Sequence, residues 1–82
     1  MARKTTNGTT TLNVVAHAML KNFWEFYITE TPDDTGVGWA LVCGDEVELG
    51  TFDWNEIKPF LRTYTTKLEE LMPPIGWQWA EA

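Results

Sequence analysis

The chain has no serine, and it has only one cysteine and one histidine among its 82 residues. Without serine there is no serine-based triad, a lone cysteine cannot form an internal disulfide, and one Cys with one His cannot supply a typical structural zinc site. A nucleophilic pair of Cys43 and His17 is formally available, but we expect His17 on a polar helix stripe and Cys43 at a hairpin end. We therefore expect no enzyme activity, no bound metal and no cofactor.

Long apolar runs are also missing, since none approaches the roughly 20 residues that a membrane-spanning helix needs. At the same time, 44% of the residues are hydrophobic and five are tryptophan, which is too apolar a composition for a disordered chain. We expect residues 1–82 to form a single small domain in the cytoplasm, where an unpaired cysteine is usual. The threonine-rich residues 1–10 are expected to be a flexible arm.

Basic residues are missing from the centre of the chain. No Lys or Arg lies between Lys21 and Lys58, whereas nine acidic residues do, and the whole chain has a formal net charge of −6. Such a negative field repels the phosphates of nucleic acids and attracts basic partners. We expect a basic protein as partner, and neither nucleic acid nor a membrane.

Residues 11–23 have the spacing of an amphipathic helix. Apolar side chains recur at intervals of three and four residues from Leu12 to Phe23, which is the pattern of one helix face. A threonine at position 10 or 11 can cap the first turn. The opposite, polar stripe of this helix contains His17.

Three strands are expected next, over residues 24–30, 37–43 and 46–52, because β-branched and aromatic residues are frequent there and the first segment alternates clearly. Only Gly44 and Asp45 separate the last two segments, and a glycine at the first central position suits a two-residue type II′ turn. The three strands are therefore predicted to form an antiparallel meander.

The two-residue turn fixes the expected register of the last two strands. It pairs Val42 with Val47 and Ala40 with Leu49, which gives one apolar face against which the N-terminal helix is expected to pack. The opposite face then carries Glu48. On this prediction, the substitution Leu49→Asp buries an unpaired charge and unfolds the domain.

Short helices are expected after the meander. Asp53 and Glu56 have the spacing of a capping box, and Pro59 makes the helix that they start short or kinked. A second capping box starts a helix over residues 66–72, and a final short strand over 76–80 is left open. The predicted fold class is α+β, with an N-terminal helix, a three-stranded antiparallel meander and short C-terminal helices.

The central segment, residues 26–57, reads FYITETPDDTGVGWALVCGDEVELGTFDWNEI. It resembles the core of the uncharacterised bacterial domain family number 2958, which is carried on phages, plasmids and other mobile elements. The matching positions are Tyr27, Thr29, Glu30, Leu41, Val42, Gly44, Glu46, Glu48, Leu49, Gly50, Phe52 and Glu56. The departures are Ala40 in place of Gly and Asp45 in place of an aromatic residue. The family has no established activity, so the resemblance implies a fold and a mobile-element setting, not a mechanism.

The outer face of the predicted meander is the candidate binding surface. If the C-terminal tryptophans do not fold across it, it exposes an apolar patch rimmed by acidic residues, and such patches mark interaction sites. The candidate binding residues are Tyr27, Trp39, Leu41, Glu46 and Glu48. The sequence thus predicts a small acidic accessory protein that binds a basic protein partner.

Two other functions are left open. One is a small metal-dependent hydrolase that uses Glu46 and Glu48, which on a single strand would lie on one face roughly 7 Å apart. The other is an acidic mimic of nucleic acid that inhibits a DNA-binding protein of the host, since a dense negative surface imitates the phosphate backbone.

Overall fold

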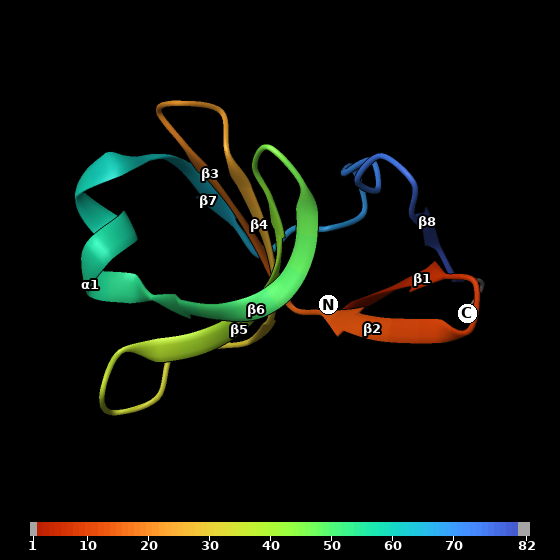
Figure 1. Ribbon diagram of the computed structural model, residues 1–82, viewed down its shortest axis with the longest axis horizontal. Helices are drawn as coiled ribbons and strands as arrows, with labels where there is room; N and C mark the ends of the chain where they lie inside the picture. Colours follow the sequence, from red (N-terminus) through yellow and green to blue (C-terminus); the bar gives the residue numbers. More distant parts are fainter. Residues whose placement is uncertain (1, 81–82) are drawn as a thin grey trace.

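β-Strands make up most of the computed structural model, which describes residues 2–80 (Figure 1). The strands are β1 (Arg3–Asn7), β2 (Thr10–Val14), β3 (Ala16–Leu20), β4 (Glu25–Glu30), β5 (Val37–Cys43), β6 (Val47–Asp53), β7 (Leu61–Thr65) and β8 (Gln78–Trp79). They form a three-stranded sheet in the order β2-β1-β8 and a five-stranded sheet in the order β6-β5-β4-β3-β7. All recorded pairings are antiparallel. The expected fold class, an α+β domain with an N-terminal helix, is therefore wrong.

The segment expected to be the N-terminal helix is instead two strands in succession, β2 and β3, each in a different sheet. Only Val15 separates them, and its backbone N–H donates a hydrogen bond to the carbonyl oxygen of Ile28 at 2.8 Å. Ala16, His17 and Ala18 are consecutive and all buried, so both faces of β3 are covered. A strand covered on both faces shows no alternation, and its periodicity does not distinguish it from a helix.

The three central strands lie close to their expected positions, as β4, β5 and β6, but they do not form a separate meander. β3 precedes them in the same sheet, and β7 returns to pair with β3. Between β4 and β5, Phe26 lies opposite Val42 and Ile28 opposite Ala40.

The register between β5 and β6 differs from the expected one by a single residue. Cys43 pairs with Val47 across a three-residue turn, so Leu41 lies opposite Leu49 and Val42 opposite Glu48. A one-residue shift moves every side chain of a strand to the other face. Leu49 is therefore 47% exposed, and the expected apolar face that combined it with Val42 does not exist.

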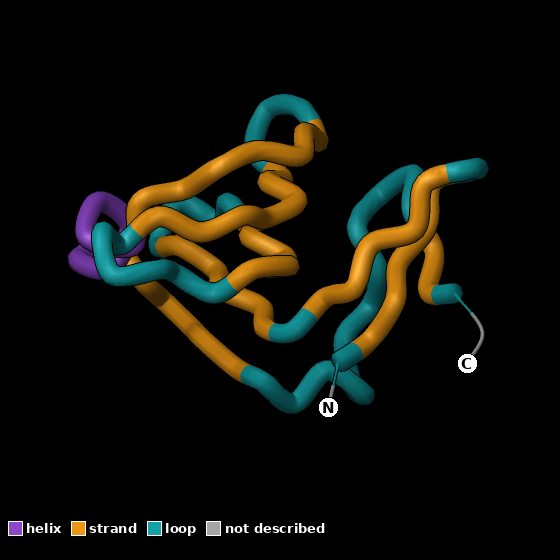
Figure 2. Tube along the Cα trace, turned by 90° about the horizontal axis from the view of Figure 1, so that it is seen from below, coloured by secondary structure: helices purple, strands orange, loops and turns teal. Residues whose placement is uncertain are grey.

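The five-stranded sheet has two faces, which we call inner and outer. The inner face carries the main hydrophobic core, formed by Ala16, Ala18, Leu20, Phe26, Ile28, Ala40, Phe52 and Ile57. The helix α1 (Trp54–Ile57) and the 3-10 turn η1 (Lys58–Phe60) lie at one end of this sheet, and the smaller sheet lies at the other end (Figures 1 and 2). The Asp53 side chain caps α1 by accepting a hydrogen bond from the N–H of Asn55 at 2.8 Å. The short helix expected before Pro59 is confirmed.

The C-terminal segment covers part of the outer face. Leu68 is buried there with Val14, Tyr27 and Leu41. The helix expected over residues 66–72 is wrong, because this segment has no regular secondary structure in the described chain. The short strand left open near the C-terminus is present as β8.

β1 is the central strand of the three-stranded sheet. β1, in the region expected to be a flexible arm, pairs with both β2 and β8. Thr5 is completely buried, and its hydroxyl donates a hydrogen bond to the carbonyl oxygen of Gln78 at 3.1 Å. A buried polar side chain with a satisfied donor fixes this strand in place.

Candidate functional site

The five residues predicted to bind a partner do not lie together on one exposed surface. Tyr27 is only 3% exposed and Leu41 only 1%, because the C-terminal segment covers them. Trp39, further along β5, is 44% exposed. Glu46 lies in the turn before β6, and Glu48 lies on β6 itself. The structure thus buries two residues of the predicted surface and places Glu48 on the face of the sheet opposite to that of Trp39.

The C-terminal segment that covers Tyr27 is held by both aromatic and polar contacts. The rings of Tyr27 and Trp79 pack edge to face with their centres 6.2 Å apart, and the indole N–H of Trp79 donates a hydrogen bond to the carbonyl oxygen of Leu71 at 2.8 Å. The Arg3 guanidinium lies over the Trp79 ring at 5.0 Å, a cation–π distance. This part of the outer face is therefore a second core and not a binding surface.

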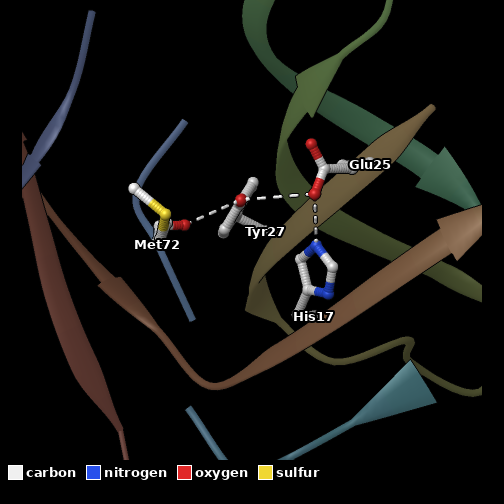
Figure 3. A network of polar contacts seen from close by, with 4 residues as sticks. All are labelled: His17, Glu25, Tyr27 and Met72. Carbon is white, nitrogen blue, oxygen red and sulfur yellow. Dashed lines mark hydrogen bonds and ion pairs between the residues drawn. The ribbon is translucent and has the colours of Figure 1, made fainter. Parts of the chain in front are cut away.

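A polar network lies under this cover (Figure 3). The Nε2 atom of His17 lies 3.0 Å from Oε1 of Glu25. The Tyr27 hydroxyl, which has one proton, lies 3.0 Å from the carbonyl oxygen of Met72 as its nearer acceptor and 3.4 Å from the same Glu25 oxygen. Sequence reasoning missed this network because it placed His17 on a helix. If residues 16–28 had been recognised as a hairpin, the pairing of His17 with Tyr27 would have brought the three side chains together.

The electrostatics of the network oppose nucleophilic chemistry at Cys43. Burial, together with the charge of Glu25 across the sheet, raises the pKa of the Cys43 thiol to about 11. Burial is also the main cause that raises the pKa of Tyr27, followed by the charge of Glu25. The nucleophile of a cysteine enzyme is the thiolate, so a thiol that holds its proton at neutral pH is a poor one. The network is best understood as satisfying buried polar groups.

An exposed apolar patch remains on the outer face of β5 and β6, beyond the C-terminal cover. It consists of Val37, Trp39, Val47 and Leu49, which are 37–47% exposed; we call it the β5–β6 patch. Sequence reasoning found only Trp39 of these four, because the assumed two-residue turn placed Val47 and Leu49 on the inner face. Large apolar side chains grouped on one strand pair are typical of interaction surfaces.

Glu48 of β6 lies on the other side of the same strand, near the acidic turn residues Asp45 and Glu46. Glu48 is opposite Val42, and an open hollow of about 380 Å³ on that side is lined by Trp24, Val42, Asp45, Glu46 and Glu48. β6 is also an edge strand, since within residues 2–80 it pairs with β5 alone. Near the turn, the free edge of β6 therefore has Val47 and Leu49 on its outer side and Glu48 on its inner side.

The geometry does not support the metal-dependent alternative. Glu46 and Glu48 do not project from one strand as a carboxylate pair, because Glu46 belongs to the turn. Within residues 2–80, no three His, Cys, Asp or Glu side chains are grouped in a way that could hold a metal ion.

In the described part of the chain, no helix is long and apolar enough to cross a membrane. No protein-family model, no curated protein and no solved structure matches the chain. The resemblance of residues 26–57 to family 2958 therefore stays a prediction.

Proposed function

We propose that this chain is a non-enzymatic accessory protein that binds a basic protein segment at the free edge of β6. The observation that carries the proposal is that the β5–β6 patch adjoins the edge strand β6, whose other side has Glu48 beside the acidic turn. An exposed sheet edge accepts an extended segment as an added strand through backbone hydrogen bonds. The same surface is large and apolar enough on one side to anchor side chains.

The two sides of β6 specify what such a strand should contain. Side chains of an added strand alternate between the two faces of the sheet. Those on the outer side would meet Val47, Leu49 and Trp39, and those on the inner side would meet Glu48 and its acidic neighbours. A partner segment that alternates apolar with basic residues fits both sides.

The negative charge around β6 also favours a basic partner. The segment from Gly44 to Glu56 has five acidic residues and no basic one, so its field accelerates the approach of a cationic segment and repels nucleic acid. Aromatic residues are enriched among residues that dominate binding energy, and Trp39 is the exposed aromatic residue of the β5–β6 patch.

The proposal is tested by titrating the protein with a synthetic peptide of about ten residues that alternates lysine with valine. The control peptide has glutamate in place of lysine. We expect saturable binding of the first peptide alone. Trp39→Ala should weaken it by about 2 kcal/mol or more, whereas Ile75→Ala, which removes an exposed apolar side chain outside β5 and β6, should leave it unchanged.

The acidic side is tested by the double substitution Glu46→Gln and Glu48→Gln. It should slow association and reduce its salt dependence, since charges at the rim mainly steer the approach. Equal binding of both peptides contradicts the proposal, and so does binding of duplex DNA at about 0.15 M salt.

The proposed function includes a place in the cytoplasm and an origin on a mobile element. The single cysteine is compatible with a reducing cytoplasm, and the resemblance of residues 26–57 to family 2958 supports an origin on a phage, plasmid or other mobile element. The alternative function as a nucleic-acid mimic uses the same acidic side of β6. This alternative predicts that the partner is a DNA-binding protein. In a competition assay, duplex DNA should displace this chain from that partner.

A further inference from the structure

The second edge of the five-stranded sheet has the opposite charge. Within residues 2–80, β7 pairs with β3 alone, so its other side is free. The segment from Ile57 to Leu68, which contains β7, has Lys58, Arg62 and Lys67 and no acidic residue. One sheet therefore ends in an acidic edge at β6 and a basic edge at β7.

A fourth cation lies beside the basic edge. The backbone N–H of Lys21, at the end of β3, donates a hydrogen bond to the carbonyl oxygen of Phe60 at 2.8 Å. This bond places Lys21 next to the turn that leads into β7. The positive charge is thus contributed by two chain segments that the fold brings together.

The basic edge also exposes large aromatic side chains. Phe23, Phe60 and Tyr64 are 47–64% exposed, and the Arg62 guanidinium lies 5.1 Å from the centre of the Phe23 ring. Phe23 has a φ of 69°, a left-handed conformation that is strained for a bulky residue. Strained residues are held in place by their surroundings and gather at functional sites.

We propose that the basic edge at β7 of one copy of this chain binds the acidic edge at β6 of another copy. This inference rests on the proposed function, because it names the protein's own β7 edge as a basic partner of the β6 edge. Each edge combines unpaired strand backbone, exposed apolar side chains and one sign of charge. The two sets of charges are complementary, whereas two β6 edges or two β7 edges repel one another.

The contact is head to tail, since it joins two different surfaces. A heterologous contact leaves one free edge of each kind on every dimer, so association continues to a closed ring or an open chain of copies. A symmetric dimer, in contrast, uses one surface twice and stops at two copies.

The first measurement is the mass of the unmodified full-length protein by light scattering across protein concentration and salt. We expect the average mass to rise with concentration and to fall as salt is raised from about 0.05 to 0.5 M, because added ions screen the edge charges. A monomer at every concentration and salt overturns the inference, and so does association that strengthens with salt.

The second measurement uses two charge-reversed proteins, chosen to alter exposed side chains. One carries Glu46→Lys and Glu48→Lys, which changes the charge of the segment from Gly44 to Glu56 from −5 to −1. The other carries Lys58→Glu and Arg62→Glu, which changes the charge of the segment from Ile57 to Leu68 from +3 to −1. Each is expected to be monomeric alone, and an equimolar mixture is expected to associate, because the unchanged β7 edge of the first meets the unchanged β6 edge of the second. A mixture that stays monomeric overturns the inference, as does either protein associating alone as strongly as the wild type.

Thermal unfolding followed by circular dichroism shows whether the reversed proteins fold. If one does not, the milder pairs Glu46→Gln with Glu48→Gln and Lys58→Gln with Arg62→Gln replace them. Each is expected to weaken self-association at least tenfold at low salt, and no change overturns the inference.

The lysine–valine peptide separates the two proposals. A wild-type protein that binds this peptide but stays monomeric contradicts self-association and leaves the proposed function standing. A protein that neither binds the peptide nor self-associates contradicts both. If the peptide dissociates the assembled copies, the β6 edge serves both contacts.

Discussion

The Tyr27 hydroxyl donates a hydrogen bond to the carbonyl oxygen of Met72, 3.0 Å away and 45 residues further along the chain. This bond connects the outer face of the five-stranded sheet with the irregular segment that covers it. The segment contributes few backbone ladder bonds of its own, so its position depends on contacts with the sheet.

Tyr27→Phe should therefore loosen the cover without unfolding the sheet. We expect a loss of about 1 kcal/mol in the free energy of unfolding, the usual value of one hydrogen bond. Hydrogen exchange should become faster at Leu71 and Trp77. Tyr64→Phe, at an exposed tyrosine, is the control and should change neither quantity. Unchanged exchange in the Tyr27 variant contradicts a role of this bond in holding the cover.

Leu41 and Leu49 lie opposite each other on the outer face, yet they should respond very differently to truncation. Leu41→Ala should cost about 2–5 kcal/mol, because Leu41 is fully buried. Leu49→Ala should cost less than about 1 kcal/mol, because half of its side chain is already in water.

Leu49→Asp should likewise leave the domain folded, which is the reverse of the expectation from sequence. Chemical denaturation followed by tryptophan fluorescence gives the free energy of unfolding of Leu41→Ala, Leu49→Ala and Leu49→Asp. A cooperative transition lost in Leu49→Asp contradicts the observed register of β6.

Stability should fall at alkaline pH because of Cys43 and Tyr27. The pKa of Cys43 is raised from 9.0 to about 11, and that of Tyr27 is raised in the same direction from 10.0. Both groups are neutral when protonated, so the native state holds their protons more tightly than the unfolded chain does. The contribution of Cys43 is fully present below about pH 9 and is lost as the pH rises through about 11, whereas that of Tyr27 is fully present below about pH 10 and is lost at higher pH than that of Cys43.

This pH dependence is measured by urea unfolding at a series of pH values. Cys43→Ala should flatten the decline between about pH 9 and 11, whereas the decline caused by Tyr27 should remain. An identical profile for the wild type and the Cys43 variant shows that the thiol titrates normally in the native state.

Gly38 and Gly50 form a matched pair of glycines on neighbouring strands. A Cβ atom at Gly38 would lie 2.6 Å from the carbonyl oxygen of Glu30 and 2.8 Å from the Phe52 ring, whereas nothing lies within 4 Å of one at Gly50. Gly38→Ala should therefore cost about 1–3 kcal/mol through overpacking, and Gly50→Ala should cost less than about 1 kcal/mol. Melting temperatures of the two variants give the comparison, and equal melting temperatures contradict the close contact at Gly38.

The predictions from sequence succeeded where a local signal had a single structural meaning. Alternation identified β4, Asp53 identified the start of α1, and Pro59 identified its early end. β3 was not predicted because its consecutive residues Ala16 and His17 are buried on opposite faces, Ala16 in the main core and His17 against Tyr27. Burial on both sides removes the period of two on which the recognition of strands depends.

The faces of β6 differ from the predicted ones because the turn before it is one residue longer than expected. A Gly-Asp pair suits a two-residue turn, yet the turn includes Glu46 as well, as shown by the hydrogen bond from the N–H of Gly44 to the Glu46 carbonyl oxygen at 3.1 Å. Turn length depends on backbone dihedral angles that these residue types permit in several combinations. The extra residue exchanged the faces of Glu48 and Leu49, so the predicted acidic outer face is in fact apolar.

The bond between Thr5 and Gln78 joins residues 73 positions apart, which has a consequence for the order of folding. Most neighbours in the five-stranded sheet are consecutive strands, and contacts that close short loops form early. The pairing of β1 with β8 must close almost the whole chain, which carries the largest entropy cost. The addition of β8 to the hairpin of β1 and β2 is therefore expected to come last and to open first. Transient opening would uncover Tyr27 and Leu41 while the sheet that carries both edges stays intact.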